Sequence, residues 1–589
     1  MCGIAGIWSK SSDLIENKLY VQNMIQQINH RGPDFVGFWE DELEGIYLGH
    51  GRLSILDLSV AGHQPMISKS GKYVISFNGE IYNHSDLKKE LEKKTQDIKW
   101  VGHSDTEILL ELIDTYGLEK ALNKCIGMFA IALWNKEENS LTLVRDRIGE
   151  KPLYYGFTGQ NEKESFLFGS ELSALKNLRI FKNEINPLAL SELLNYQVIS
   201  APNCIFKNIF QLEPGHLVKI ISSRKEDLGK SIPWWRLSSC VDKSFEDQIS
   251  NEKEAIIFME RTLREAIKMQ SIADVPLGAF LSGGIDSSLI TALLQKESAN
   301  NVKTFTIGFE NKNFDEAPFA REVAKYLNTD HNEFYLTSKD AQNLIPSLSK
   351  IYSEPFADSS QLPTHLVCRE ARNYGLKVAL SGDGGDELFG GYNRYFLGEK
   401  IWKKANLLPW KIRRIFGEVG IRLPNQELDS ILKIFGINQI GTKISKLSSR
   451  LKDVRNEDEF YYLLISLWNN PSFLFHEDYQ NQLHHTFPKA MKLKLPLSIK
   501  DNLTAKMMFY DALNYLPNDI LTKVDRAAMA ASLETRAPFL DHRVIEGAWR
   551  INMGLKVKSN KWLNTNKWVL RKILYKYVPQ DLVDRPKMG

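Results

Sequence analysis

Cysteine is scarce in this chain. Five cysteines occur among 589 residues, at Cys2, Cys125, Cys204, Cys240 and Cys368. Their number is odd, and no two of them have the spacing of a Cys-x-x-Cys pair. Disulfide frameworks need paired cysteines, and structural zinc sites use closely spaced ones. The sequence therefore argues against both, and free thiols suit the reducing cytoplasm in which we expect the protein to work.

The chain also lacks a charge bias and a long apolar run. Its 75 basic and 72 acidic residues give a formal net charge of +3, which indicates no preference for nucleic acid. The apolar run at residues 128–134 is far too short to cross a bilayer, so we expect no integral membrane segment. We expect no secretory leader ahead of Cys2. A length of 589 residues, without internal repeats, favours two or more domains.

The first part of the chain combines short strands with helices. Short β-rich runs predict strands at residues 3–8, 73–77, 128–134, 141–145 and 166–169. Asn78-Gly79 is a typical turn dipeptide, and we expect it to follow the second of these strands as a turn. Apolar residues three and four apart predict a helix over 105–116. Residues 2–215 are therefore predicted to form an α+β domain.

The second part alternates strands with helices. The pattern predicts, in chain order, a helix at 255–269, a strand at 275–281, a helix at 286–295, a strand at 303–309, a helix at 317–327 and a strand at 376–380. This alternation is typical of a parallel sheet in a doubly wound α/β domain, which we assign to residues 240–589. Residues 222–250 are polar with little periodicity and are expected to connect the domains, while the chain after Tyr395 is expected to be mainly helical.

Cys2 is the most informative residue. It follows the initiator methionine, so removal of Met1 would give one residue both a thiol and a free α-amine. The amine, with an ordinary pKa near 8, can act as the general base for its own thiol. An incidental small residue after Met1 is the alternative, and the residues that follow favour the nucleophile.

A glycine-rich loop at residues 280–288 lies between a predicted strand and a predicted helix. Gly283 and Gly284 let a phosphate approach the backbone, and the helix that follows offers free N–H groups and its positive dipole end. Asp286 would place a carboxylate among phosphate ligands, which is sensible if Mg²⁺ shares the site. The loop lacks the lysine of a GxxxxGK[ST] loop. A purely structural Gly-Gly turn is the alternative.

A second loop of this kind, at residues 381–392, also follows an apolar strand. It holds five glycines and three acids, for which core packing gives no reason. Ligands of open α/β sheets bind at the carboxyl ends of the strands, where both loops are predicted to lie. Asp286 and Asp386 are therefore candidate ligands for one or two Mg²⁺ ions that bridge a triphosphate. Two solvated acidic turns are the alternative.

Lys523 begins a Lys-Val-Asp-Arg sequence in a predicted helical region. A lysine there would act as a point charge on a departing pyrophosphate. The alternative is a surface face of ion pairs, formed with Asp525 and Arg526.

Taken in order, these motifs resemble the glutamine-hydrolysing asparagine synthetase family over essentially the whole chain. The quoted motifs are Cys2-Gly3-Ile4-Ala5-Gly6, Arg31-Gly32-Pro33-Asp34, residues 49–55, Phe77-Asn78-Gly79-Glu80-Ile81-Tyr82-Asn83, Ser104-Asp105-Thr106-Glu107, residues 145–153, the two glycine-rich loops and residues 523–542. Each motif is weak alone, and the ordered set is highly specific. The resemblance implies an αββα sandwich of the N-terminal-nucleophile hydrolase type, followed by an ATP-pyrophosphatase α/β domain with a helical extension.

The resemblance implies a glutaminase site in the first domain. Cys2 would attack the glutamine carboxamide and release ammonia, with Asn78 and the Gly79 N–H as the oxyanion hole. Arg52 would bind the α-carboxylate, and Glu80 and Asp105 would bind the α-ammonium or hold its surroundings. The resemblance adds Leu53, Ser54 and Ile55 to the glutamine-binding residues. From the residues alone, Arg52 could instead form a structural ion pair, and Asp105 could be a helix N-cap.

The resemblance implies a nucleotide site in the second domain. ATP-binding positions are Leu281, Ser282, Gly283, Gly284, Asp286, Ser287, Ile307, Ser381 and Gly382. Asp383 would help the intermediate form and capture ammonia, Asp386 would share Mg²⁺ with Asp286, and Lys523 would contact pyrophosphate. The implied reaction activates aspartate as a β-aspartyl-adenylate, which ammonia then attacks. Ammonia would cross between the domains through an apolar passage.

Two other functions stay open at this point. The motif style also resembles members suspected of amidating other carboxylates, such as sugar uronic acids, and a regulatory or binding homologue without synthesis is the alternative from another class. The chain ends at Arg585-Pro586-Lys587-Met588-Gly589, where relatives usually continue, so we expect a shorter natural form or the loss of a segment over the nucleotide site. Basic and aromatic residues in 400–450 are expected to form a solvated helical face rather than a contact with a partner or membrane. A homodimer is possible.

Overall fold

The computed structural model describes most of the chain. The described residues are 1–9, 14–94, 98–159, 164–313, 315–422, 451–468, 471–480, 483, 487–559 and 564–584. Among them, no helix is both long and apolar enough to cross a membrane. The chain end at 585–589 and most of the basic region, 423–450, lie outside the described residues.

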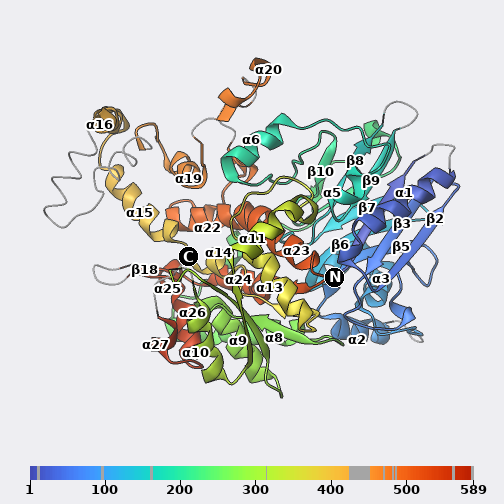
Figure 1. Ribbon diagram of the computed structural model, residues 1–589, viewed down its shortest axis with the longest axis horizontal. Helices are drawn as coiled ribbons and strands as arrows, with labels where there is room; N and C mark the ends of the chain where they lie inside the picture. Colours follow the sequence, from blue (N-terminus) through green and yellow to red (C-terminus); the bar gives the residue numbers. More distant parts are fainter. Residues whose placement is uncertain are drawn as a thin grey trace.

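Two antiparallel sheets of six strands form the first domain (Figure 1). The first sheet has the order β10 (Ile209–Gln211), β8 (Tyr154–Thr158), β9 (Ser165–Gly169), β1 (Gly3–Trp8), β3 (Ile46–Arg52), β2 (Phe35–Asp41). The second has the order β12 (Ile232–Pro233), β11 (His216–Ile220), β7 (Ser140–Arg145), β6 (Gly127–Asn135), β5 (Tyr73–Ile81), β4 (Met66–Ile67). The strands predicted from the sequence are all present within these sheets.

Helices cover the outer face of each sheet. On the first sheet, α1 (Leu14–Gln27) and α5 (Leu172–Lys176) share an apolar cluster with β1. On the second sheet, α2 (His84–Lys94), α3 (Asp105–Tyr116) and α4 (Leu118–Lys124) pack on β5 and β6. A third cluster lies between the sheets, where Trp8 meets Trp134 edge to face at 5.1 Å. These layers confirm the predicted αββα sandwich.

The predicted turn at Asn78-Gly79 is wrong. Both residues lie inside β5, opposite Ala130 and Phe129 of β6. A Cβ atom on Gly79 would lie 2.2 Å from the backbone oxygen of Met128, so the glycine permits a close approach of strands. The dipeptide is a turn signal only where the chain reverses within two residues, and here the strand continues to Ile81.

A parallel sheet of five strands forms the centre of the second domain. Its order is β15 (Asp330–Leu336), β14 (Lys303–Phe309), β13 (Leu277–Phe280), β16 (Val378–Leu380), β17 (Glu534–Arg536). One face packs on α8 (Glu252–Gln270), α9 (Ile285–Glu297) and α10 (Ala317–Leu327), and the other on α13 (Gln361–Asn373) and α23 (Leu521–Met529). The predicted parallel α/β domain is confirmed, and its strands end at the two glycine-rich loops.

The chain after Tyr395 is mainly helical, as expected, although β17 of the sheet also lies there. The helices from the second glycine-rich loop onward include α14 (Gly385–Phe389), α15 (Asn393–Ala405), α16 (Trp410–Arg422), α19 (Glu457–Ile465), α22 (Leu503–Leu513), α24 (His542–Arg550), α25 (Met553–Lys556) and α26 (Trp568–Leu574). The expected solvated face is only partly right. Lys403, Lys411 and Arg414 are exposed, but Trp402 is buried and the Arg413 guanidinium lies 5.1 Å from its ring.

The segment 222–250 is more ordered than its polar composition predicts. It contains α7 (Leu237–Glu246), whose Leu237, Cys240 and Val241 are buried in the core of the second domain. These apolar residues recur three and four apart, a periodicity that the polar flanks conceal. The sequence-based limits of the two domains, 2–215 and 240–589, stay predictions.

Candidate active site

Cys2 lies buried at the start of β1, next to the second domain. Its backbone N–H donates to Asn78 Oδ1 at 3.0 Å, and the backbone N–H of Leu53 donates to its thiol. Burial raises the pKa of the thiol, and the nearby chain-terminal amine and Arg52 oppose this effect. Met1 is present in this chain, and its amino group lies 2.9 Å from Glu534 Oε2. The Cys2 nitrogen is thus an amide here, so a free Cys2 amine requires removal of Met1.

Asn78 has a donor that is free to act. Its side chain is fully buried, and within the described part of the chain Nδ2 has no hydrogen-bond partner. Since Oδ1 is fixed by the Cys2 N–H, the amide is oriented beside the cysteine with its NH₂ group available. An unpaired buried donor costs about 1–3 kcal/mol unless a ligand satisfies it. This geometry suits an oxyanion hole.

Arg52 is held by the loop that follows β3. Its guanidinium donates to the Ser59 carbonyl at 2.8 Å and to the carbonyls of Leu56 and Asp57. The alternative that Arg52 forms a structural ion pair is wrong for the described residues, because its partners are uncharged backbone carbonyls. Ser54 donates its N–H to Asp34 Oδ2, while Leu53 and Ile55 pack against Met1 in an apolar cluster at the domain contact.

Three acids lie close together near Cys2. Glu80 is buried on β5, and burial, with Glu534 and Asp105 nearby, raises its pKa well above the ordinary value. Asp105 accepts from the Ile81 N–H at 2.8 Å, and burial also raises its pKa. The N-cap of α3 is Ser104, so the capping alternative for Asp105 is wrong. Such a cluster is suited to a cationic group such as an α-ammonium.

One cavity in the second domain brings together every nucleotide-site residue predicted from the sequence. Its volume is about 1230 Å³, and it opens at the carboxyl ends of the parallel strands. The predicted residues among its walls are Leu281, Ser282, Gly283, Gly284, Asp286, Ser287, Ile307, Ser381, Gly382, Asp383, Asp386 and Lys523.

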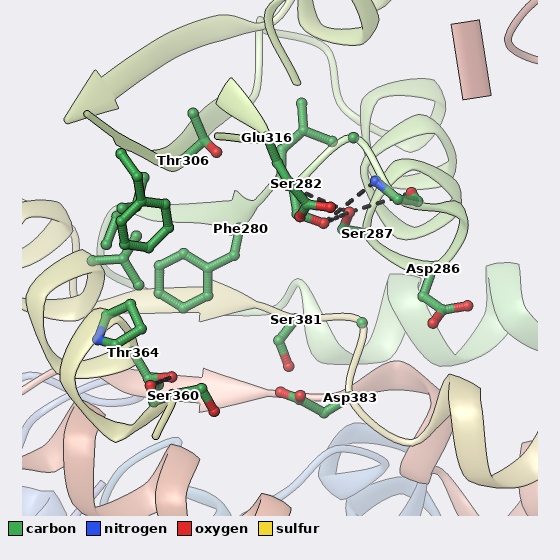
Figure 2. Close-up of a pocket in the computed structure, with 18 of the residues that line it drawn as sticks. Phe280, Ser282, Asp286, Ser287, Thr306, Glu316, Ser360, Thr364, Ser381 and Asp383 are labelled. Atoms are coloured by element: carbon green, nitrogen blue, oxygen red, sulfur yellow. Dashed lines mark hydrogen bonds between the residues drawn. The ribbon is translucent and has the colours of Figure 1, made fainter. Parts of the chain in front are cut away.

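The first glycine-rich loop is tied by its own hydroxyls. Ser282 and Ser287 lie 3.0 Å apart through their Oγ atoms, and the Ser282 N–H donates to Ser287 Oγ at 3.1 Å. Figure 2 shows Ser381 and Asp383 of the second loop across the cavity from these serines. The first loop leads into α9, whose N-terminus offers backbone N–H groups to an anion.

Asp286 and Asp386 converge on one point. Lys567 Nζ contacts both carboxylates, the second at 2.5 Å. A Cβ on Gly385 would lie 2.6 Å from Asp286 Cγ, so this glycine leaves room for the carboxylate. Mg²⁺ is usually held by one or two carboxylates together with substrate phosphates. The two carboxylates, which already share one cation, the Lys567 ammonium, are the kind of donor that fits such an ion.

The second loop and α23 supply the remaining groups. Burial raises the pKa of Asp383, while Lys523 opposes the shift. Lys523 Nζ lies 2.8 Å from Asp358 Oδ2, and the ion pair lowers the pKa of Asp358 to about 2. The surface alternative for this helix is wrong, since Lys523, Asp525 and Arg526 are all buried. Lys523 faces the cavity and Asp525 pairs with Arg31 of the first domain, so this helix does not present an ion-pair face to solvent.

Buried ion pairs join the two sites. Arg31 donates to the Cys2 carbonyl at 3.2 Å and forms two bonds, at 2.8 and 2.9 Å, to Asp525 of α23. Arg31 also pairs with Glu171 at 2.8 Å. Breaking one member of such a pair leaves a buried charge and costs about 3–5 kcal/mol. The helix that carries Lys523 is thereby fixed to the residue that carries the thiol.

Sequence reasoning missed several residues of this arrangement. Lys567 and Asn566 line the cavity from just before α26. Asp358 lies outside all of the motifs, and its carboxylate accepts a hydrogen bond from Lys523. Nothing local marks them, because each is a single polar residue outside a glycine-rich run. The Arg-Gly-Pro-Asp motif is visible in the sequence, but the sequence does not indicate that its Arg31 pairs with Asp525, 494 positions away.

Fold and site together define a class: an αββα sandwich of the N-terminal-nucleophile hydrolase type with a cysteine at position 2, joined to an α/β domain of the ATP-pyrophosphatase type. The family model "Glutamine amidotransferase domain" matches residues 1–235, and the model "Asparagine synthase" matches residues 259–589. The chain belongs to the asparagine synthase family, in which the sequence motifs had placed it.

Relatives match along nearly the whole chain. Asparagine synthetase (glutamine-hydrolyzing) 1 of Bacillus subtilis is 32% identical to this chain. The match spans 100% of this chain and 86% of that protein. Putative asparagine synthetase (glutamine-hydrolyzing) 2 of Methanocaldococcus jannaschii is 34% identical over 90% of this chain and 98% of its own. Amidase chry2 of Gibberella zeae is 27% identical over 96% of this chain and 84% of its own. The first two names denote a ligase that hydrolyses glutamine.

Proposed function

We propose that the protein makes asparagine from aspartate, with glutamine as nitrogen donor and ATP as energy source. The observation that carries this proposal is a single chain in which Cys2 faces an unpartnered amide donor, while the other domain presents the two glycine-rich loops around one cavity. Two relatives named as asparagine synthetases, of whose lengths this chain covers 86% and 98%, support the same activity.

In the first domain, Cys2 attacks the carboxamide carbon of glutamine once Met1 has been removed. The Cys2 amine takes the thiol proton, and the oxyanion receives hydrogen bonds from Asn78 Nδ2 and the Gly79 N–H. Arg52 binds the α-carboxylate, while Glu80 and Asp105 bind the α-ammonium. Ammonia leaves as the thioester forms, and water then releases glutamate.

In the second domain, ATP lies between the loops with Ser282, Gly283 and Ser287 at its pyrophosphate. Asp286 and Asp386 would hold Mg²⁺, which supplies charge neutralisation at the phosphates when bound. Lys523 and Lys567 stabilise the departing pyrophosphate. The β-carboxylate of aspartate displaces it from the α-phosphorus, since a carboxylate is a poor acyl donor until its oxygen becomes a leaving group.

Ammonia then attacks the acyl carbon, and AMP leaves. The attacking nitrogen loses one proton, for which the raised pKa of Asp383 makes its carboxyl group a suitable acceptor. Both sites act in one protein, which we expect to work in the cytoplasm.

The test measures pyrophosphate release from ATP with Mg²⁺ and ammonia, in the presence of aspartate, a sugar uronate or neither acid. We expect release with aspartate, matched by asparagine. Release only with another acid would keep the mechanism and replace the acceptor, and no release with any acid would favour a homologue without synthesis.

A second acceptor class has one observation in its favour. The cavity of about 1230 Å³ exceeds the roughly 300–1,000 Å³ usual for small-molecule pockets, and Thr337, Ser338 and Ser360 supply hydroxyls along its walls. Such a space could take ATP with a carboxylate larger than aspartate, such as a sugar uronic acid. The comparison of acids above decides between the two.

A further inference from the structure

One ammonium group lies between the two carboxylates that are proposed to hold the metal. Lys567 comes just before α26, Asp286 lies in the first turn of α9 and Asp386 lies in α14. The helix α26 packs against α9 (Figure 1) and also contacts α14. Lys567 Nζ contacts Asp286 Oδ2, and it lies 2.5 Å from Asp386 Oδ1. The side chains of the lysine and the two acids are 9%, 14% and 19% exposed, so solvent screens these ion pairs weakly.

The backbone around this contact places the lysine against the second glycine-rich loop. Asn566 Nδ2 donates to the Gly391 carbonyl at 2.7 Å, and the Lys567 N–H donates to the Phe389 carbonyl at 3.3 Å. A Cβ atom on Gly391 would lie 1.8 Å from Asp386 Oδ1 and 2.2 Å from Lys567 Cε, so this glycine leaves room for the ion pair. Lys567 has a φ of +53°, a left-handed backbone that favours glycine or asparagine. The reason for a lysine at this position therefore lies in its side chain.

The ammonium and a metal ion cannot use these two carboxylates at the same time. A Mg²⁺ held by both acids would lie about 2.0–2.1 Å from an oxygen of each. Lys567 Nζ already lies 2.5 Å from Asp386 and in contact with Asp286, so the two cations would occupy the same space. They would also repel each other where solvent screens little. A metal can bind to both acids only after Nζ has moved away.

We propose that Lys567 is a placeholder cation, which occupies the metal position in the nucleotide-free protein and leaves it when a metal–nucleotide complex binds. The inference rests on the proposed function, which places Mg²⁺ and ATP in this cavity. It concerns the order of binding, and it goes beyond the pyrophosphate contact proposed above because the lysine acts before any nucleotide is present. Metal alone is then excluded from the two acids, and metal with nucleotide is admitted.

The cavity offers the displaced ammonium a new partner. Lys567 lines it together with Ser282 and Ser287 of the first glycine-rich loop. ATP at that loop brings several negative charges, and the flexible stem of a lysine lets Nζ reach them while the backbone stays in place. A metal alone brings no such partner, so displacement of Lys567 would break two ion pairs without forming new ones. Metal and nucleotide should therefore bind cooperatively, each raising the affinity for the other by the same factor.

The test measures metal binding without turnover. Mn²⁺ takes the place of Mg²⁺, because it prefers the same oxygen ligands and its free ion gives an electron paramagnetic resonance signal that is lost on binding. Dissociation constants for Mn²⁺ are measured on the full chain, first without nucleotide and then with α,β-methylene-ATP. The bridge between the α- and β-phosphates of this analogue cannot be cleaved. No acceptor and no nitrogen source are added, so the readout does not depend on synthesis.

Four variants separate the placeholder from a general loss of charge. Lys567→Met keeps an unbranched side chain and removes the charge, and Lys567→Arg keeps the charge. Lys523→Met is the matched control, because it removes an equal charge from the same cavity but from an ion pair with Asp358. Asp286→Asn, alone and combined with Lys567→Met, shows whether the ion binds at this site. Melting temperatures check that each variant is folded.

Without nucleotide, we expect Lys567→Met to bind Mn²⁺ at least about tenfold more tightly than the unaltered protein, since the competing cation is gone. Lys567→Arg and Lys523→Met should stay within about threefold of the unaltered protein, and adding Asp286→Asn to Lys567→Met should abolish the gain. The nucleotide analogue should tighten Mn²⁺ binding to the unaltered protein, and this increase should be at least about tenfold smaller in Lys567→Met.

Each contrary result has a distinct meaning. Equal nucleotide-free affinities of the unaltered protein and Lys567→Met would overturn the placeholder and leave the proposed synthesis standing. A gain that survives Asp286→Asn, or that Lys523→Met reproduces, would also overturn it. Asp286→Asn alone should leave nucleotide-free Mn²⁺ binding unchanged, and a loss there would overturn the placeholder even if Lys567→Met did not fold. If no protein binds Mn²⁺ with the analogue, the metal site of the proposed function fails, and the placeholder fails with it.

Discussion

The two proposed sites differ in how they treat solvent and charge. In the first domain, Cys2, Asn78, Glu80 and Asp105 are all buried, and strand backbones confine them. In the second, the loops border a cavity of about 1230 Å³, and acids are paired with lysines. The first site is a set of buried side chains within a sandwich, and the second is a cavity at the carboxyl ends of parallel strands.

The difference follows from the chemistry proposed for each site. A tetrahedral intermediate carries one new charge, which a few fixed donors stabilise best where water is excluded. A triphosphate brings several charges of its own, so its site needs cations and backbone N–H groups around a larger space. Substitutions at each site should therefore affect one half-reaction and spare the other.

The largest expected effect tests this separation at the thiol. Cys2→Ala should abolish glutamine-dependent synthesis and leave ammonia-dependent synthesis within about twofold, because the nucleophile is absent and the nucleotide cavity is untouched. Product formation with each nitrogen source is the measurement, and Cys125→Ala is the control for loss of a buried thiol. Loss of both activities in a folded variant would contradict the separation.

The reciprocal change is at the metal-binding carboxylates. Asp286→Asn should lower pyrophosphate release about 10³-fold, since the charge that would hold Mg²⁺ is removed. Glutamine hydrolysis should stay within about threefold. Asp330→Asn, at an exposed position of the same domain, serves as the control and should change neither rate. If Asp286→Asn and Asp330→Asn released pyrophosphate at the same rate, Asp286 would not be a residue of the nucleotide site.

A smaller effect sharpens the description of the buried first site. Asn78→Ala should lower the kcat of glutamine hydrolysis by about 10²–10³-fold, because the variant loses the one side-chain donor of the oxyanion hole. The KM for glutamine should change far less, since the donor acts on charge that develops in the transition state. Steady-state kinetics separate the two constants, and a change in KM alone would make Asn78 a binding residue only.

The smallest effect on activity concerns a buried charge that neither site uses. Lys556 is fully buried without a partner in the described structure, near the Trp549 ring, and burial lowers its pKa to about 7. The unfolded chain keeps the ordinary value, so it binds more protons between pH 7 and about 10.4, and stability rises with pH across that window. Lys556→Met should therefore add about 3–5 kcal/mol at pH 7.

Urea unfolding at several pH values measures this gain. The gain should shrink as pH rises from 7 toward 10, because the penalty for the buried amine disappears once both states are neutral. A gain that is the same at every pH would show that packing, rather than charge, is responsible. Activity with both nitrogen sources should be kept.

The sequence made the second site easier to predict than the first. Its two glycine-rich loops are continuous in sequence, and the rule that strand ends gather at one edge of a parallel sheet placed them together. Lys567 escaped this reasoning because it reaches Asp286 from 281 positions away and lies in no motif. Local patterns report what a segment is, and not which distant segment it meets.

The first site shows the same limit in another form. Cys2 was marked by its position, but Asn78-Gly79 carries a local signal for a turn and lies in a strand because β6 pairs with it along its length. Arg31 and Asp525 look like ordinary surface charges in sequence and become a buried pair only when the domains meet. The resemblance to a family supplied the roles that local physics could not.

The most direct test of the central claim is the stoichiometry of one reaction mixture. Protein lacking Met1 is given glutamine, aspartate, ATP and Mg²⁺, and glutamate, asparagine, AMP and pyrophosphate are measured together. The account predicts that asparagine, AMP and pyrophosphate form in equal amounts, with at least as much glutamate. Glutamate without AMP and pyrophosphate, whichever carboxylate is supplied, would contradict it.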